Sequence, residues 1–146
     1  MLHKSDWVHL IPHAGGMCLL DAVFDWNTAG IHASSEGHAR ADHPLRGAGG
    51  LHAVHLAEYG AQAMAVHGAL LARARGVEVA RPGMLVSLRE VVLRVEYVSF
   101  DGRLDVHAEC LYADDAGAQY AFRVDRAGQL LASGRAAVIH PHGPLP

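Results

Sequence analysis

The feature that most constrains this chain is the stretch of residues 51–72, in which Glu58 is the only Asp, Glu, Lys or Arg. The stretch is dominated by Ala, Leu, Val, Met and His and contains no Pro, a composition that favours helix. Two Arg residues and Gly76 follow it, as is typical of a helix end. The sequence therefore predicts one long helix over residues 51–74. Because that helix is apolar on nearly every face, other elements have to surround it.

The segments on both sides of this helix have strand-like patterns, and turn signals separate the later ones. The predicted strands cover residues 17–26, 31–37, 84–98, 103–113, 118–125 and 129–139. We expect an antiparallel sheet that curls around the helix, which is the α+β architecture called the hot-dog fold. A plain α+β sandwich is the alternative. The helix residues expected to be buried are Leu51, Val54, Met64 and Leu71.

Length and composition predict a single domain, residues 1–146, with a frayed tail at 139–146. The chain is 51% hydrophobic and 18% charged, which favours a buried subunit interface. Its net charge is −3 without a stripe of Lys or Arg, so neither nucleic acid nor a membrane surface is an expected partner. Cys18 and Cys110 form no CxxC pair, and the first residues lack the apolar core of a signal peptide. We therefore expect a cytoplasmic protein.

Glu58 is the first candidate catalytic residue. A carboxylate inside a buried helix is costly when it is ionised and unpaired. Removal from water favours the protonated form of a carboxyl group, and a general acid needs that form at neutral pH. The alternative is structural: Glu58 points out to solvent, or it joins a network with Tyr59 or a histidine. We interpret Glu58 as a proton donor.

Three histidines are candidate bases, because a neutral imidazole is the usual acceptor for a proton next to a carbonyl. His13 precedes the first long strand, His38 follows the second, and His43 lies in the loop that leads to the helix. For each of them alone, a surface or structural role is the alternative. His67 is predicted to pack in the core or at an interface.

Two further patterns are candidate ligand sites. His55 and Glu58 share a helix face, but a metal site of that kind needs further Glu-rich helices, which the sequence lacks. We therefore predict no metal and no cofactor. Residues 47–50 are Gly-Ala-Gly-Gly, and the N–H groups of Gly49 and Gly50 are candidates to bind a thioester carbonyl or an enolate oxygen. A flexible entry to the helix is the alternative.

Two blocks resemble the FabZ-like 3-hydroxyacyl carrier-protein dehydratases, a hot-dog family. Residues 10–23, LIPHAGGMCLLDAV, are similar to the family's L-P-H-x-x-x-x-L-L opening, and residues 56–65, LAEYGAQAMA, to its L-x-E-x-x-A-Q helix. Residues 42–46 and 58–70 resemble more specifically the divergent ApeP-like dehydratases of aryl-polyene gene clusters. The likeness places Glu58 on the catalytic carboxyl and makes Gln62 a substrate-binding candidate.

The family's usual G-H-F-P loop is missing, so the likeness leaves the base open. His13 lies in the better-matched block, and His43 stands nearest to the usual position. The resemblance implies dehydration of a 3-hydroxyacyl thioester, carried on acyl carrier protein or coenzyme A, to a trans-2-enoyl thioester. It also implies a homodimer, or a heterodimer with another hot-dog subunit, whose His and Glu come from different subunits. The alternatives are a hot-dog thioesterase and a non-catalytic acyl-binding partner subunit.

Overall fold

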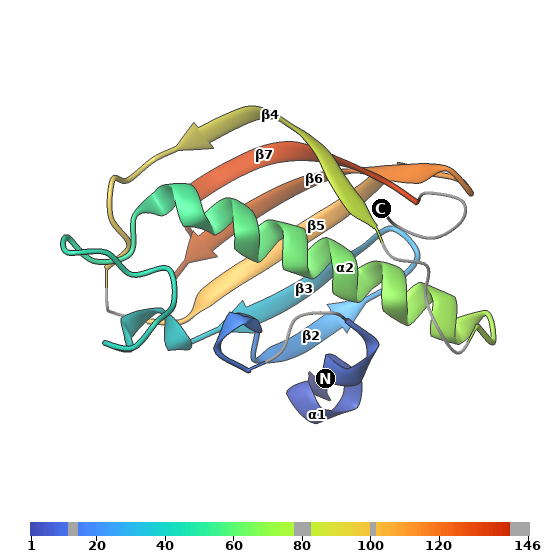
Figure 1. The fold of residues 1–146 in the computed structure, drawn as a ribbon, viewed down its shortest axis with the longest axis horizontal. Coiled ribbons are helices and arrows are strands. Elements are labelled where there is room, and N and C mark those ends of the chain that lie inside the picture. Colours follow the sequence, from blue (N-terminus) through green and yellow to red (C-terminus); the bar gives the residue numbers. More distant parts are fainter. Residues whose placement is uncertain (12–14, 78–82, 100–101, 141–146) are drawn as a thin grey trace.

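The computed structural model describes residues 1–11, 15–77, 83–99 and 102–140. Within these ranges, seven strands form one antiparallel sheet that curls around a single long helix, which confirms the expected hot-dog fold (Figure 1). The strand order is β1-β2-β3-β5-β6-β7-β4. The strands are β1 Leu2–His3, β2 Ala22–Trp26, β3 Gly30–Ser35, β4 Met84–Leu93, β5 Leu104–Ala113, β6 Gly117–Arg126 and β7 Gln129–Ile139.

The central helix begins later than its composition predicts. α2 covers Leu56–Ala74, and a 3-10 turn, Ala53–His55, precedes it. Residues 51–53 are tied to the segment after β4, because the Ala53 N–H donates to the Glu96 carbonyl and the Val98 N–H donates to the Leu51 carbonyl, both at 2.8 Å. These backbone hydrogen bonds hold residues 51–52 in an extended conformation and so delay the start of the helix.

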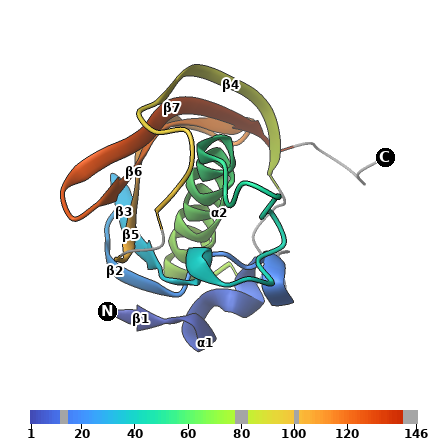
Figure 2. The same ribbon diagram turned by 90° about the vertical axis from the view of Figure 1, so that its left-hand side faces the viewer.

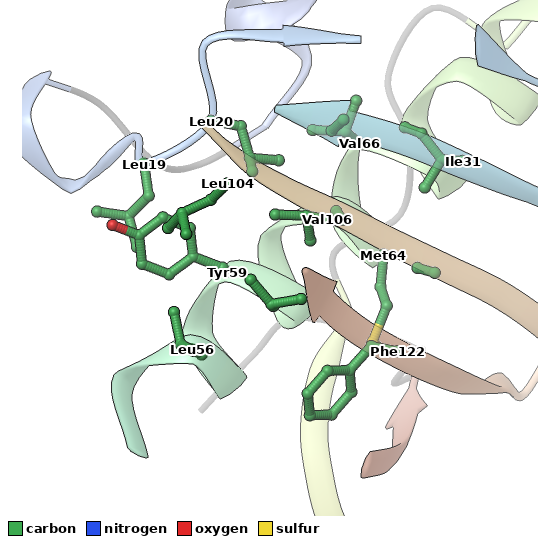
Figure 3. Close-up of a cluster of buried hydrophobic side chains, with 14 of the residues drawn as sticks. Leu19, Leu20, Ile31, Leu56, Tyr59, Met64, Val66, Leu104, Val106 and Phe122 are labelled. Atoms are coloured by element: carbon green, nitrogen blue, oxygen red, sulfur yellow. The ribbon is translucent and has the colours of Figure 1, made fainter. Parts of the chain in front are cut away.

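The concave face of the sheet covers α2, as the end-on view shows (Figure 2). Leu51 and Met64 are buried as expected, with 1% and 4% of their surface exposed. The expectation for Val54 is wrong, since this side chain lies in the 3-10 turn and is 50% exposed, and Leu71 is only partly buried. Aromatic and aliphatic side chains of α2 meet those of β5 and β6 in the core (Figure 3).

Gly60 has a packing role inside α2. A Cβ atom at this position would lie 2.6 Å from the ring of Phe122 on β6, and one at Gly134 on β7 would lie 2.9 Å from the same ring. The two glycines therefore allow the Phe122 ring to fill the space between the helix and the sheet. No helix of the described ranges is long and apolar enough to cross a membrane.

The predicted first strand, 17–26, is only partly a strand. A 3-10 turn covers Gly15–Met17, residues 18–21 are irregular, and β2 starts at Ala22. At the N-terminus, the short helix α1, Lys4–Trp7, lies beside the sheet and buries Trp7 completely. Segment 17–21, from the last residue of the 3-10 turn to the start of β2, runs next to the start of α2, so its contacts decide the surroundings of Glu58.

Candidate active site

Glu58 lies in the first turn of α2 and is half-buried. Because the helix starts at Leu56, Glu58 lies near its N-terminal end. The sequence had suggested a position near the middle of a fully buried helix. One turn further along, the Gln62 Nε2 lies 3.3 Å from the Glu58 Oε1. The carboxyl group is thus accessible from one side and held from the other.

Gln62 is completely buried, and its amide connects α2 to the irregular segment. The Gln62 Oε1 accepts a hydrogen bond from the Leu19 N–H at 2.8 Å, and Nε2 donates to the Met17 carbonyl at 2.7 Å. The sequence made Gln62 a substrate-binding candidate. In this chain its amide bonds to protein groups.

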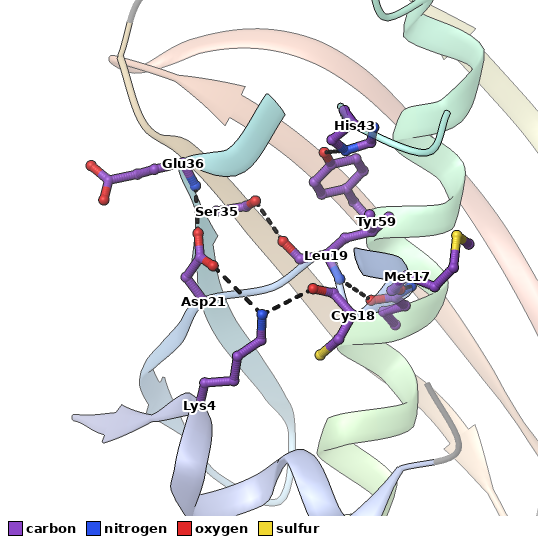
Figure 4. Close-up of polar contacts among 10 residues, drawn as sticks. Lys4, Met17, Cys18, Leu19, Asp21, Ser35, Glu36, His43 and Tyr59 are labelled. Atoms are coloured by element: carbon purple, nitrogen blue, oxygen red, sulfur yellow. Dashed lines mark hydrogen bonds and ion pairs between the residues drawn. The ribbon is translucent and has the colours of Figure 1, made fainter. Parts of the chain in front are cut away.

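His43 is 9% exposed, and each of its ring nitrogens takes part in a hydrogen bond. Figure 4 shows the one with Tyr59. The Leu45 N–H donates to Nδ1 at 3.1 Å, so we assign the ring proton to Nε2, which donates to the Tyr59 Oη at 2.9 Å. Burial and the nearby His38 and Arg46 lower the pKa of His43. The ring is therefore neutral at pH 7, but its lone pair is already used.

Of the other two candidate bases, His38 and His13, only His38 lies in the described part of the chain. His38 is 1% exposed, and neither ring nitrogen forms a hydrogen bond of good geometry within the described ranges, although the Ser99 backbone lies nearby. Burial lowers the pKa of His38. His13 lies outside the described residues. In the described part of the chain, the ring nitrogens of His43 thus bind Leu45 and Tyr59.

The glycine run forms a tight turn ahead of the helical region. Gly47 and Gly50 exchange two backbone hydrogen bonds, of 2.9 and 3.1 Å, and Gly50 has a φ of 106°. The N–H of Gly50 is therefore engaged, whereas the N–H of Gly49 forms no hydrogen bond within the described part of the chain. The half-exposed ring of Tyr97 covers Gly49, where an added Cβ would lie 2.7 Å from its Oη. Sequence reasoning missed Tyr97.

The first N–H groups of the helical region are also occupied. The Val54 N–H donates to the His52 Nδ1 at 3.0 Å, and the Ala53 N–H is bound by residue 96. These two N–H groups are therefore engaged within the protein. Within the described ranges, no group of three or more His, Cys, Asp or Glu side chains is arranged to hold a metal ion.

His67 is buried in the core, as expected. Its Nε2 donates to the Asn27 carbonyl at 2.7 Å, which leaves Nδ1 to accept the Tyr120 hydroxyl at 2.6 Å. Burial lowers the pKa of His67. This ring joins α2 to β6 and to the turn after β2, and it does not contact Glu58.

We expect the protein to lose stability on mild acidification. Burial lowers the pKa of four rings, those of His38, His43, His67 and His107. Their full contribution to stability is present above about pH 6.5, the unfolded value, and is lost as the pH falls toward the lower folded-state values, because the unfolded chain then binds more protons. The midpoint of thermal unfolding should therefore drop between about pH 7 and pH 5.

Two variants test whether buried histidines cause this acid sensitivity. His107→Gln should reduce the loss between the two pH values, whereas His3→Gln, at an exposed position, should leave it unchanged. A thermal midpoint that stays constant over this range in the wild-type protein would contradict the prediction.

Comparisons with known proteins agree with this architecture. The family model for ApeP-like proteins, described as ApeP dehydratase, matches residues 5–145. A chain of the dehydratase heterocomplex ApeI:P from Xenorhabdus doucetiae superposes with a TM-score of 0.83, at 23% identity, over 91% of this chain and 89% of that chain. AziG from S. sahachiroi gives 0.61 at 21% identity, over 90% and 97% of the two chains.

A variant of the phenylacetic acid degradation protein PaaI from Thermus thermophilus superposes with a TM-score of 0.58, at 21% identity, over 82% of this chain and 91% of that chain. At these identities the structural likeness establishes the fold alone. No curated protein matches the sequence. The fold and the family match together define a hot-dog dehydratase of the thioester type. The chain belongs to the ApeP-like dehydratase family.

Proposed function

We propose that this protein removes water from a 3-hydroxyacyl thioester on acyl carrier protein, giving the trans-2-enoyl thioester, in fatty-acid-like or polyene biosynthesis in the cytoplasm. The observation that carries the proposal is the Glu58 carboxyl, half-buried at the start of α2 and held by Gln62. A carboxyl that is both reachable and fixed suits proton transfer to a leaving group. The family match supports the reaction class.

In the proposed reaction, a neutral histidine removes the proton from C2 of the acyl chain, and the electron pair moves toward the thioester carbonyl. The protonated Glu58 gives its proton to the hydroxyl group on C3. The C3–O bond breaks, water leaves, and a double bond forms between C2 and C3. Transfer of a proton from the histidine to Glu58, through solvent, restores both groups.

We propose His13 as the base and give His43 a positioning role. The lone pair of His43 on Nδ1 already accepts the Leu45 N–H, so a role in proton removal would require this contact to break. The ring proton on Nε2 is bound by the Tyr59 hydroxyl, which suits a positioning role. His13 precedes Met17 by four residues, and the Met17 carbonyl binds the same Gln62 amide as Glu58. In a dimer, base and acid can come from different subunits.

We propose that Gly49 helps to bind the thioester carbonyl. Its N–H has no partner within the described ranges, whereas the N–H of Gly50 is used to close the turn. A free N–H directed at a developing enolate oxygen stabilises the transition state. Gly50 then contributes its φ of 106°, which shapes the turn.

The partner is proposed to be a second hot-dog chain, either identical or related, bound along β4. This strand ends the sheet, with β7 on one side and no strand of the described ranges on the other (Figure 1). Long apolar edge strands favour pairing with another chain. The structure of ApeI:P, described as a heterocomplex, supports such an assembly. The exposed apolar residues of β4 are Met84, Leu85, Val86, Leu88, Val91, Val92 and Leu93.

We expect light scattering to show at least a dimer, and we expect Val86→Lys to weaken it. Val86 is 51% exposed, and a lysine on an edge strand opposes strand pairing. The dissociation constant of the dimer should rise about tenfold or more, which corresponds to about 1.4 kcal/mol. Val77→Lys, at an exposed position outside β4, is the control and should leave association unchanged. A wild-type monomer at every concentration would contradict the proposed partner.

The reaction is tested by incubating the full-length protein, in its native assembly, with 3-hydroxyacyl thioesters of acyl carrier protein and of coenzyme A. The proposal predicts formation of the conjugated enoyl thioester while the thioester bond stays intact. Release of free thiol without enoyl product would show a thioesterase instead. Turnover of neither kind, by the protein alone, would favour a non-catalytic acyl-binding subunit.

A further inference from the structure

Side chains from three elements bind the backbone of segment 17–21, although this segment belongs to no strand (Figure 4). Gln62 on α2, Ser35 on β3 and Lys4 on α1 each bind its backbone. Consecutive peptide groups are therefore held by side chains from three separate elements. Such a segment keeps one conformation without the hydrogen-bond ladder of a sheet.

Gln62 provides the contact that joins this segment to the proposed acid. Its Nε2 donates to the Met17 carbonyl at 2.7 Å and to the Glu58 Oε1 at 3.3 Å, while its Oε1 accepts the Leu19 N–H at 2.8 Å. Both amide hydrogens and the carbonyl oxygen are thus used. The side chain is completely buried, so no donor of this amide is left for a substrate.

Ser35 and Lys4 hold the same segment from the opposite side. The Ser35 hydroxyl donates to the Leu19 carbonyl at 2.6 Å, and the Lys4 Nζ donates to the Cys18 carbonyl at 3.0 Å. The Lys4 Nζ also lies 3.8 Å from a carboxylate oxygen of Asp21. Gln62 therefore binds the N–H of Leu19, and Ser35 binds its carbonyl. These two bonds fix the backbone of Leu19, and this limits the movement of the Gln62 amide as well.

We infer that Gln62 is a positioning residue that fixes the Glu58 carboxyl relative to segment 17–21, with Ser35 as its support. This inference rests on the proposed function, in which Glu58 is the acid. One amide then orients the proposed acid and anchors segment 17–21.

Gln62→Glu tests this role with little change in shape. A carboxylate at position 62 still accepts the Leu19 N–H, but it cannot donate to Met17 or Glu58. We expect kcat to fall by about ten- to a hundredfold with KM nearly unchanged, because misplacement of a reacting group costs up to about this much. The loss should shrink as the pH is lowered, since a protonated Glu at position 62 regains one donor. Ser35→Ala should lower kcat less, because the Gln62 contact with Glu58 remains.

Tyr120→Phe is the matched control. It removes a buried hydroxyl that binds His67 at 2.6 Å, in the same core but away from Glu58. Rates are measured per folded molecule, with the thermal midpoint of each variant. If Gln62→Glu lowers kcat no more than Tyr120→Phe does, the role is only structural and the inference is overturned. A raised KM with wild-type kcat would also overturn it, because it would mean substrate binding.

The Glu58→Gln variant separates this inference from the proposed function. If Glu58→Gln turns over like the wild type, the proposed acid fails, and the positioning role fails with it. If Glu58→Gln is inactive while Gln62→Glu keeps the wild-type kcat at every pH, the proposed function survives and only the positioning role is rejected.

Discussion

Glu58→Gln is expected to lower the rate of dehydration about a hundredfold or more while the protein keeps its fold. An amide cannot protonate a leaving hydroxyl, so the acid step is lost. The shape is preserved, because the side-chain oxygen of Gln can still accept the Gln62 Nε2 that lies 3.3 Å from Glu58. The thermal midpoint should stay nearly equal, since a half-buried carboxyl group is replaced by an amide of almost the same shape.

The control for this variant is Glu109→Gln on β5, where the same change is made at an exposed position. It should alter neither turnover nor stability by more than a small amount. Thermal midpoints and dehydration rates are measured on the same preparations. A well-folded Glu58→Gln protein with near wild-type turnover would remove Glu58 from the mechanism.

His13→Ala should also reduce dehydration by about a hundredfold or more, because a positioned base typically contributes at least that factor. His43→Ala should act mainly on stability. It removes the acceptor of the part-buried Leu45 N–H and one partner of the buried Tyr59 hydroxyl, and loss of a partner costs a buried polar group about 1–3 kcal/mol. The two variants therefore separate a catalytic histidine from a structural one.

His107→Ala, on the face of the sheet away from α2, is the control for a general effect of losing a histidine. The measurement is the dehydration rate per folded molecule at one pH above 6.5, roughly the ordinary pKa of histidine, where the neutral form dominates. Equal and small losses in all three variants would show that the base lies elsewhere. A larger rate loss in His43→Ala than in His13→Ala would return the base to His43.

The sequence predicted the hot-dog architecture because its decisive signals are local. A stretch with one charge over residues 51–72 indicates a helix that must be covered, and the alternating segments after it indicate an antiparallel meander. The structure confirms both. The helix boundary was wrong because residues 51–53 pair with residues 96–98, a contact between distant parts of the chain that periodicity does not contain.

The surroundings of Glu58 were harder to predict for the same reason. Gln62 binds the backbone at positions 17 and 19, more than forty residues away in sequence, and Ser35 comes from a third element. From the sequence alone, Gln62 could equally be an amide on the surface of a helix, and Ser35 an ordinary serine in a strand. Only the fold shows that they converge on one segment.

The exposed apolar residues of β4 show a further limit of sequence patterns. The sequence predicted a strand over residues 84–98, and the structure has it over Met84–Leu93, so the last five residues were wrong. The same pattern predicted one buried face, but every residue of the strand except Ser87 is exposed in the isolated chain. A hydrophobic pattern indicates that side chains are buried in the functional protein. It does not indicate whether the same chain or a partner chain buries them.

The central claim is that this chain exchanges water at C3 of an acyl thioester, and the most direct test is the reverse reaction in water labelled with heavy oxygen. The full-length protein in its native assembly is mixed with a trans-2-enoyl thioester of acyl carrier protein, and the products are analysed by mass spectrometry. We expect label in the C3 hydroxyl of a 3-hydroxyacyl thioester, with the thioester intact, and loss of that label in Glu58→Gln. Label in a free carboxylate, with release of the carrier thiol, would contradict it.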